Sequence, residues 1–210
     1  EHLADEAQAW RRKDILDLDD FSVQEIDLVL HTADAMREVL KRPVPRVPAL
    51  RSATVVTLFY EASTRTRASF ERAAKVLSAD TIAVSATGSS VEKGESLIDT
   101  VRTLESLGAG IIVMRHSLAG APYLAARHVT SSVINGGDGS HAHPTQALLD
   151  LFTIKSHLGK IDGLRVVIVG DILYSRVARS NLWGLTKMGA QVVLCGPPTL
   201  MPPDFINGYR

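Results

Sequence analysis

From Thr54 onward, short apolar runs alternate with amphipathic segments, and this order constrains the fold more than any other feature. The runs have the length of strands, and the segments between them place apolar residues at helical spacing. The predicted strands are 54–60, 81–85, 110–114, 132–135, 165–170 and 191–195, and the predicted helices are 66–78, 95–107, 119–127, 144–158 and 175–188. Strands that alternate with helices favour parallel sheets with right-handed crossovers. We therefore predict an α/β fold of doubly wound parallel sheets.

One more helix is predicted before this alternation begins. Ser22 and Glu25 have the spacing of a capping box, and apolar residues recur at helical spacing from there to Leu40. Three prolines between residues 43 and 48 then indicate a linker.

A second break is expected near residues 145–163, where a helix runs into a polar stretch and Gly163 precedes a new strand. We therefore predict a first domain over residues 1–150 and the beginning of a second over residues 151–210. Two successive sheets would place a cleft between these domains.

The composition narrows the class of protein. Among 210 residues, 23 Lys and Arg balance 23 Asp and Glu, so no basic stripe indicates nucleic acid. No apolar run has the length of a membrane span, and the polar N-terminus lacks the apolar core of a signal peptide. Cys195 is the single cysteine, which excludes a disulfide within the chain and favours a reducing, cytoplasmic location.

Ser63-Thr64-Arg65-Thr66-Arg67 begins three residues after the end of the first predicted strand and opens a helical segment. The first turn of a helix has unpaired N–H groups and the positive end of the helix dipole, so a phosphate is favourable there. Arg65 and Arg67 can add charge-assisted hydrogen bonds. The alternative is an ordinary N-cap followed by surface arginines. Five such residues in succession after a buried strand favour the phosphate.

Unusual polar clusters follow several of the predicted strands: 63–67, 89–93, 115–116, 136–143 and 171–176. Open α/β sheets bind ligands at the carboxyl ends of their strands, so these clusters predict one crevice. Within it, His143 precedes a helix that Pro144 can open, and Gln146 can present its amide to the same ligand. A capping histidine beside a solvated glutamine is the alternative for His143 and Gln146 alone.

Two segments carry a resemblance to a known family. Residues 59–71 resemble the carbamoyl-phosphate signature of the carbamoyltransferases, and residues 143–150 match their second signature. Three further segments are similar to the aspartate-using rather than the ornithine-using members: residues 93–96, 114–116 and 170–180. The resemblance covers about residues 15–200. It implies two doubly wound parallel-sheet domains, the carbamoyltransferase fold, with the second domain incomplete in this chain.

The resemblance also implies roles for individual residues. Seven of them would bind carbamoyl phosphate: Ser63, Thr64, Arg65, Thr66, Arg115, His143 and Gln146. Arg176 would bind a carboxylate of L-aspartate, and Glu61 would pair with an arginine of the second domain when the domains close. Ser89 and Lys93 would enter the site of a neighbouring subunit, in a homotrimer with shared active sites. Such a trimer would also be compatible with a regulatory subunit or a dihydroorotase partner.

The implied reaction is attack by the amine of L-aspartate on carbamoyl phosphate, which gives N-carbamoyl-L-aspartate and phosphate for pyrimidine biosynthesis. The residues favour catalysis by orientation and electrostatics. The negative charge that develops on the carbonyl oxygen could be stabilised by Arg115, Thr66 and neutral His143. The charge on the leaving phosphate could be stabilised by Arg65 and Lys93. No cofactor is expected.

Two other kinds of site are disfavoured. After the predicted strand 165–170, Gly170 is followed by Asp171 and bulky residues, so the glycine fingerprint of a dinucleotide site is missing. His141 and His143 lie two residues apart without a third ligand at metal-binding spacing, so no metal is expected.

Members of the family continue well beyond the equivalent of residue 210. The resemblance therefore implies a truncated aspartate domain, and the 210 residues alone are expected to turn over little aspartate. Three functions stay open at this point: part of a catalytic chain, a non-catalytic paralogue with a binding or scaffolding role, and transfer to ornithine or another amine.

Overall fold

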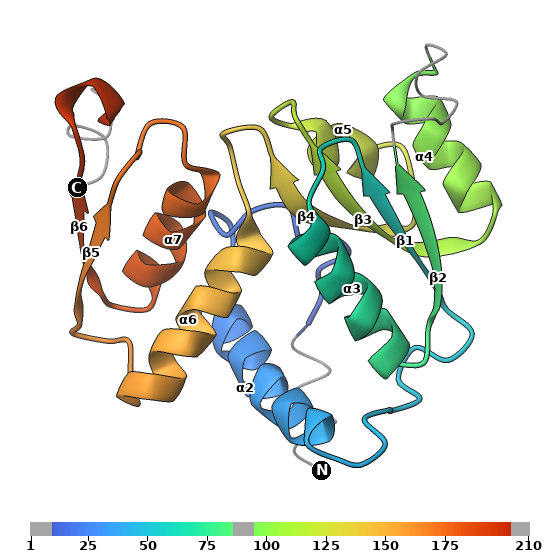
Figure 1. The fold of residues 1–210 in the computed structure, drawn as a ribbon, viewed down its shortest axis with the longest axis horizontal. Coiled ribbons are helices and arrows are strands. Elements are labelled where there is room, and N and C mark those ends of the chain that lie inside the picture. The colour runs from blue at the N-terminus through green and yellow to red at the C-terminus, as the bar shows by residue number, and fades with distance from the viewer. Residues whose placement is uncertain (1–9, 86–94, 203–210) are drawn as a thin grey trace.

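The computed structural model describes residues 10–85 and 95–202 of the chain (Figure 1). Its strands are β1 (Thr54–Phe59), β2 (Asp80–Ser85), β3 (Ala109–His116), β4 (Ser132–Asp138), β5 (Arg165–Val169) and β6 (Gln191–Cys195). They form a four-stranded sheet in the order β2-β1-β3-β4 and a two-stranded sheet of β5 and β6. Every pairing within these sheets is parallel, which confirms the α/β prediction.

The helices are α2 (Val23–Leu40), α3 (Thr64–Val76), α4 (Leu97–Ser106), α5 (Ala121–Ala126), α6 (Pro144–Leu158) and α7 (Arg176–Lys187), with a 3₁₀ turn at Pro198–Leu200. The boundaries agree closely with prediction, and β4 departs most because it continues through Gly136 and Gly137 to Asp138. Glycine is a poor strand former, but the pairing of His116 with Asp138 carries the ladder past both glycines.

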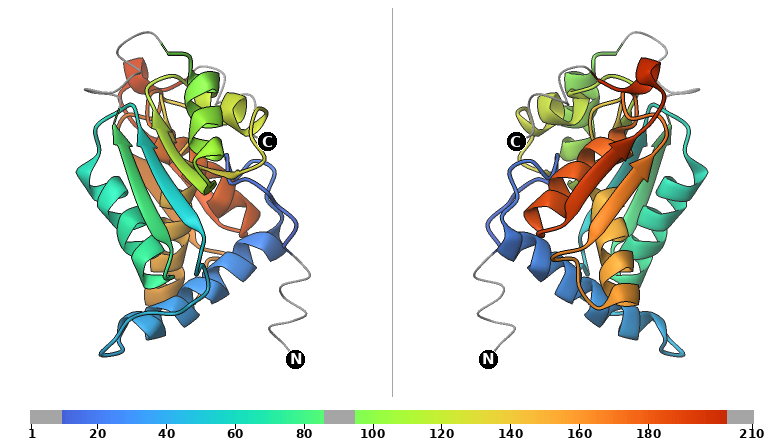
Figure 2. Two further views of the ribbon diagram at one scale, coloured as in Figure 1. Left: turned by 90° about the vertical axis from the view of Figure 1, so that its right-hand side faces the viewer. Right: turned by 90° about the vertical axis from the view of Figure 1, so that its left-hand side faces the viewer.

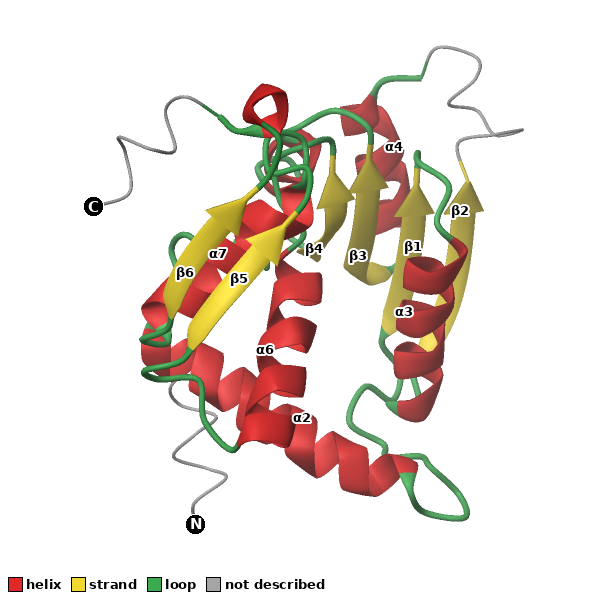
Figure 3. Ribbon diagram, turned by 60° about the vertical axis from the view of Figure 1, so that its left-hand side comes forward, coloured by secondary structure: helices red, strands yellow, loops and turns green. Residues whose placement is uncertain are grey.

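Helices cover both faces of the four-stranded sheet (Figures 1 and 3). On one face, Val56, Leu58 and Met114 pack with residues of α4 and α5 in one buried cluster. On the other, Val55 and Phe59 pack against α3. Residues 55–59 of β1 are all buried, as expected for a strand covered on both faces.

A third cluster packs α2, α6 and α7 together beside the two-stranded sheet. Phe21 and Ile26, before and within α2, pack with Leu151 of α6 and Leu185 of α7. The predicted capping box begins α2: the Glu25 N–H donates to Ser22 Oγ over 3.2 Å, and the Ser22 N–H donates to Glu25 Oε2 over 2.8 Å. Figure 2 shows α2 running beneath both sheets. Because α6 and α7 share this core, the residues at the N-terminus of one helix are held at fixed positions relative to those of the other.

Candidate active site

A cavity of about 770 Å³ lies where the carboxyl end of β3 meets the N-termini of α3, α6 and α7. Most of its polar lining consists of residues that the sequence had singled out: Ser63, Arg65, Thr66, Arg115, His143, Gln146 and Arg176. Ser69, Phe70, Thr145, Leu149 and Val177 are among the others that line it. The elements that carry these side chains are far apart in the sequence, and the parallel sheet brings them to one edge.

Two of the helix N-termini at the cavity are open to a ligand. Ser63 is the N-cap of α3, and its hydroxyl makes no capping hydrogen bond within the described part of the chain. The imidazole of His143, the N-cap of α6, likewise makes no capping hydrogen bond there. Neither first turn contains an acidic residue. The unpaired N–H groups and the two helix dipoles therefore favour an anion between them.

Glu61 connects two arginines that line the cavity. Its Oε1 accepts hydrogen bonds from the guanidinium groups of Arg115 and Arg176, the latter over 2.8 Å. Arg115 is buried and also donates to the Gly136 carbonyl over 3.1 Å, while Arg176 donates to the Gly139 carbonyl over 2.7 Å. Burial alone would raise the pKa of Glu61, but the hydrogen bonds from the two arginines outweigh it and hold that pKa below its usual range.

Gly137 lies in close contact with three of the side chains that line the cavity. A Cβ atom here would stand 2.9 Å from Arg115 Nη1, 3.1 Å from Arg176 Nε and 3.3 Å from His143 Cδ2. Its φ of +113° also lies in the region that favours glycine. Any side chain at this position would push these three groups apart.

The environment of His143 keeps its imidazole neutral. Burial, together with the charges of Arg115 and Arg176, lowers its pKa to about 4. Its Nδ1 lies 3.4 Å from Thr145 Oγ1. A hydroxyl that donates to Nδ1 leaves Nε2 with the proton, so the imidazole can donate a hydrogen bond while uncharged.

Gln146 is oriented by a second pair of polar residues. Its Nε2 donates to Asp150 Oδ1 over 2.9 Å, and Asn181 Nδ2 of α7 donates to Asp150 Oδ2 over 2.6 Å. With its amide nitrogen bonded in this way, Gln146 has its carbonyl oxygen to offer as an acceptor. Asp150 lies four residues after Gln146, one helical turn on. This spacing is the feature of the sequence from which the contact between them could have been predicted.

The low pKa of His143 predicts a specific dependence of stability on pH. Below pH 6.5 the unfolded chain protonates this histidine, whereas the folded chain does so only near pH 4. His143 therefore lowers the free energy of unfolding as the pH falls from 6.5 toward 4, by up to about 3 kcal/mol. In the variant His143→Gln, the free energy of unfolding should fall less steeply over this range, as measured by denaturant unfolding at several pH values.

The comparison with the parent protein is essential in that experiment. Burial raises the pKa of Asp17 to about 6, so its effect on stability has the opposite sign between about pH 4 and 6. Only the difference between the slopes of variant and parent, each the change in free energy of unfolding with pH, reports the contribution of His143. Equal slopes in the two proteins would contradict the low pKa.

Not every predicted residue lines the cavity. Thr64 lies in the first turn of α3 outside the lining, and Arg67 points away, with its Nε 2.9 Å from Glu71 Oε1. Residues two apart on a helix face different directions, which is why Arg67 cannot join Arg65. Ser89 and Lys93 fall outside the described residues.

Comparison with known proteins places the chain in a family. A sequence model described as "Aspartate/ornithine carbamoyltransferase, carbamoyl-P binding domain" matches residues 13–156. The chain is 67% identical over 194 residues to the aspartate carbamoyltransferase catalytic subunit of Chloroflexus aggregans. The chain belongs to the aspartate/ornithine carbamoyltransferase family. This match covers 92% of the chain and 63% of the Chloroflexus protein, so the chain spans less than two thirds of that relative.

Solved structures of the carbamoyltransferase family share the fold. The aspartate transcarbamoylase of Trypanosoma cruzi in complex with carbamoyl phosphate and aspartate has a TM-score of 0.88 and 34% identity, over 94% of this chain and 63% of that one. The catalytic subunit from M. jannaschii has a TM-score of 0.84 and 42% identity, over 93% and 64% of the two chains. These similarities confirm the predicted carbamoyltransferase fold.

The described residues contain no helix that is both long enough and apolar enough to cross a membrane. Nor do residues 10–85 and 95–202 bring together three or more His, Cys, Asp or Glu in an arrangement that could hold a metal ion.

Proposed function

We propose that this chain forms part of the catalytic subunit of an aspartate carbamoyltransferase, which transfers the carbamoyl group of carbamoyl phosphate to L-aspartate. One observation carries the proposal: Arg65, Arg115 and His143 line one cavity beside two open helix N-termini. The relatives that carry this name and the Trypanosoma cruzi complex with both substrates support it. On this proposal the reaction serves pyrimidine biosynthesis in the cytoplasm.

Carbamoyl phosphate would enter with its phosphate toward α3. Ser63, Thr64, Arg65 and Thr66 would contribute main-chain N–H groups, hydroxyls and one guanidinium to the phosphate oxygens. Arg115 and His143 would then meet the carbonyl oxygen, and the carbonyl of Gln146 would accept a hydrogen bond from the carbamoyl amide. Arg176, at the start of α7, would bind a carboxylate of L-aspartate.

The chemistry follows from where charge develops. The neutral amine of aspartate attacks the carbonyl carbon, a C–N bond forms, and negative charge accumulates on the carbonyl oxygen. Arg115 and the N–H of neutral His143 would stabilise that oxygen without reorganising. The C–O bond to phosphate then breaks with its electron pair on the leaving phosphate beside Arg65, and the amine proton passes to that phosphate.

The assay that tests this function measures phosphate release by the full-length protein, with carbamoyl phosphate and either L-aspartate or L-ornithine. Release that requires L-aspartate, with N-carbamoyl-L-aspartate as product, is expected. Release that requires ornithine would replace the proposed acceptor. Binding of carbamoyl phosphate without release with either amine would instead favour a binding role.

We also propose that the functional unit is a homotrimer in which Ser89 and Lys93 complete the site of a neighbouring subunit, as the resemblance implies. If so, full-length Lys93→Ala and His143→Ala proteins, each nearly inactive, should regain activity when they are mixed and reassembled, because some sites then contain both native residues. The measurement is kcat per site after subunit exchange. Mixed trimers that stay inactive would count against a shared site.

A further inference from the structure

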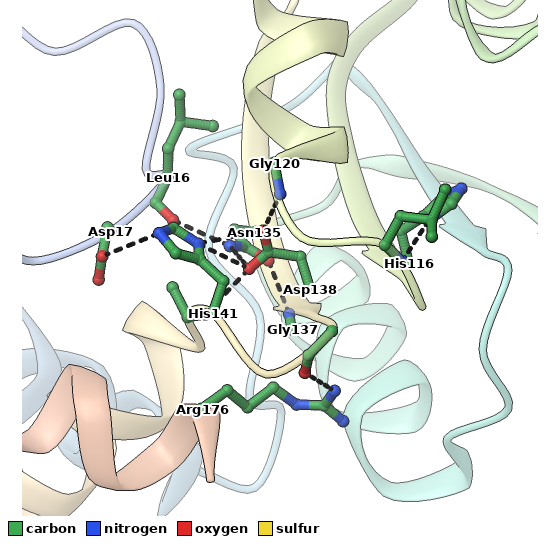
Figure 4. Close-up of polar contacts among 12 residues, drawn as sticks. Leu16, Asp17, His116, Gly120, Asn135, Gly137, Asp138, His141 and Arg176 are labelled. Atoms are coloured by element: carbon green, nitrogen blue, oxygen red, sulfur yellow. Dashed lines mark hydrogen bonds and ion pairs between the residues drawn. The ribbon is translucent and has the colours of Figure 1, made fainter. Parts of the chain in front are cut away.

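The turn between β4 and α6, residues 138–142, is organised around the buried carboxylate of Asp138 (Figure 4). Oδ1 accepts hydrogen bonds from Asn135 Nδ2 over 2.8 Å and from the Ala142 N–H over 3.1 Å. Oδ2 accepts one from the Gly120 N–H over 2.7 Å. Asp138 therefore fixes the backbone that leads directly to His143.

The imidazole of His141 lies between Asp138 and a second carboxylate (Figure 4). Its Nδ1 is 3.3 and 3.2 Å from the two carboxylate oxygens of Asp138, so Nδ1 must be the donor. Its Nε2 is 3.8 Å from Asp17 Oδ2, which comes from the segment before α2. One side chain thus joins the end of β4 to a distant part of the chain.

Asp17 in turn reaches the backbone of His143. Its Oδ1 lies 3.4 Å from the hydroxyl of Ser180 on α7, which donates to it. The same hydroxyl oxygen accepts a hydrogen bond from the His143 N–H over 2.9 Å. Ser180 is fully buried, so water does not compete for its hydrogen bonds with Asp17 and with the His143 N–H. The contacts form a closed circuit: His143 N–H, Ser180, Asp17, His141, Asp138 and the Ala142 N–H beside His143.

We propose that His141 is a positioning residue for His143. Held between Asp138 and Asp17, it fixes the turn 138–142 from one side and, through Asp17 and Ser180, the His143 backbone from the other. The imidazole of His143 is thereby kept in its buried position against Arg115. This inference rests on the proposed function for its kinetic consequences, but not for its structural ones.

The charges around His141 support this assignment. The hydrogen bond that His141 donates to Asp138 raises the pKa of His141, an effect that burial and the charge of Arg179 oppose. The charge of Asp17 adds to the increase. Burial raises the pKa of Asp17 itself to about 6, with a smaller increase from the charge of Asp19, whereas His141 lowers it. A cation at His141 therefore favours the ionised form of Asp17, which accepts the stronger hydrogen bond from Ser180.

The test compares three variants of the full-length protein. His141→Ala removes both contacts, whereas His141→Asn keeps a donor close to the position of Nδ1 and loses the reach toward Asp17. His31→Gln, at an exposed histidine of α2, is the matched control. Three quantities are measured: the NMR titration of the His143 Cε1–H, the dissociation constant of inorganic phosphate, and kcat with carbamoyl phosphate and L-aspartate.

In the parent and in His31→Gln, His143 should stay neutral down to about pH 5, because it is buried beside two arginines. In His141→Ala its midpoint should rise by about one unit or more, and kcat should fall about tenfold. His141→Asn should lie between parent and His141→Ala in both quantities. Phosphate affinity should change less than about twofold in all variants, since α3 is untouched.

Each result has a definite meaning. An unshifted His143 titration in His141→Ala overturns the positioning role, whether or not the parent is active. A loss of phosphate affinity in proportion to kcat overturns it too, because it indicates general disruption of the site. A parent without aspartate-dependent release refutes the proposed function alone, since the titration still tests His141.

Discussion

Replacing Arg115 by alanine is expected to lower kcat for carbamoyl transfer by about 10²- to 10³-fold, the cost of one well-placed oxyanion donor, roughly 3–4 kcal/mol. Arg115 is the buried guanidinium at the end of β3, and its position is set by Glu61 and the Gly136 carbonyl. Because the donor matters most in the transition state, KM for carbamoyl phosphate should change much less than kcat. Steady-state kinetics of the full-length protein measure both.

Arg115→Lys provides the control for this substitution. Lysine retains the charge but cannot donate to Glu61, Gly136 and a substrate oxygen from one planar group. We expect it to restore only part of kcat. If Arg115→Ala raised KM and left kcat unchanged, Arg115 would contribute to ground-state binding alone, and its assigned role at the carbonyl oxygen would be wrong.

Replacing Arg65 by alanine should weaken binding of inorganic phosphate by about 10- to 100-fold, since a hydrogen bond to a charged group contributes roughly 1.5–3 kcal/mol. Arg65 lines the cavity from the first turn of α3. Arg67 offers a matched control two residues later, because it lies outside the lining and pairs with Glu71. Arg67→Ala removes the same charge from the same helix.

Isothermal calorimetry with phosphate distinguishes these two arginines. If phosphate were attracted only by the net charge of this region, both substitutions would weaken binding equally, and weakly at physiological salt. A large loss for Arg65→Ala with less than about a threefold loss for Arg67→Ala indicates a directed contact. Equal losses would remove Arg65 from the proposed phosphate site.

Much of the fold could be predicted because the relevant signals are local. The alternation of apolar runs and amphipathic segments gave the order of strands and helices, and the capping box of Ser22 and Glu25 marked the start of α2. The positions of Ser63, Arg65 and His143 at helix starts also followed from neighbouring residues. These signals need no knowledge of what packs against them.

The residues that sequence analysis missed owe their roles to contacts across long separations. Gly137 is informative only once Arg115, Arg176 and His143 are known to converge on it. His141 was considered only as a metal ligand, because its partner Asp17 is more than a hundred residues away. Pairings of this kind depend on the sheet order, which periodicity does not specify.

The carboxylate of Glu61 couples ligand binding in the cavity to the contact between the two sheets. This single group pairs with Arg115, which belongs to the four-stranded sheet, and with Arg176, which begins the helix beside the two-stranded sheet. A ligand that brings its own negative charge to either arginine must compete with Glu61 for it. We therefore expect entry of such a ligand to exchange one anion for another, and this exchange would change the contact that links the two sheets.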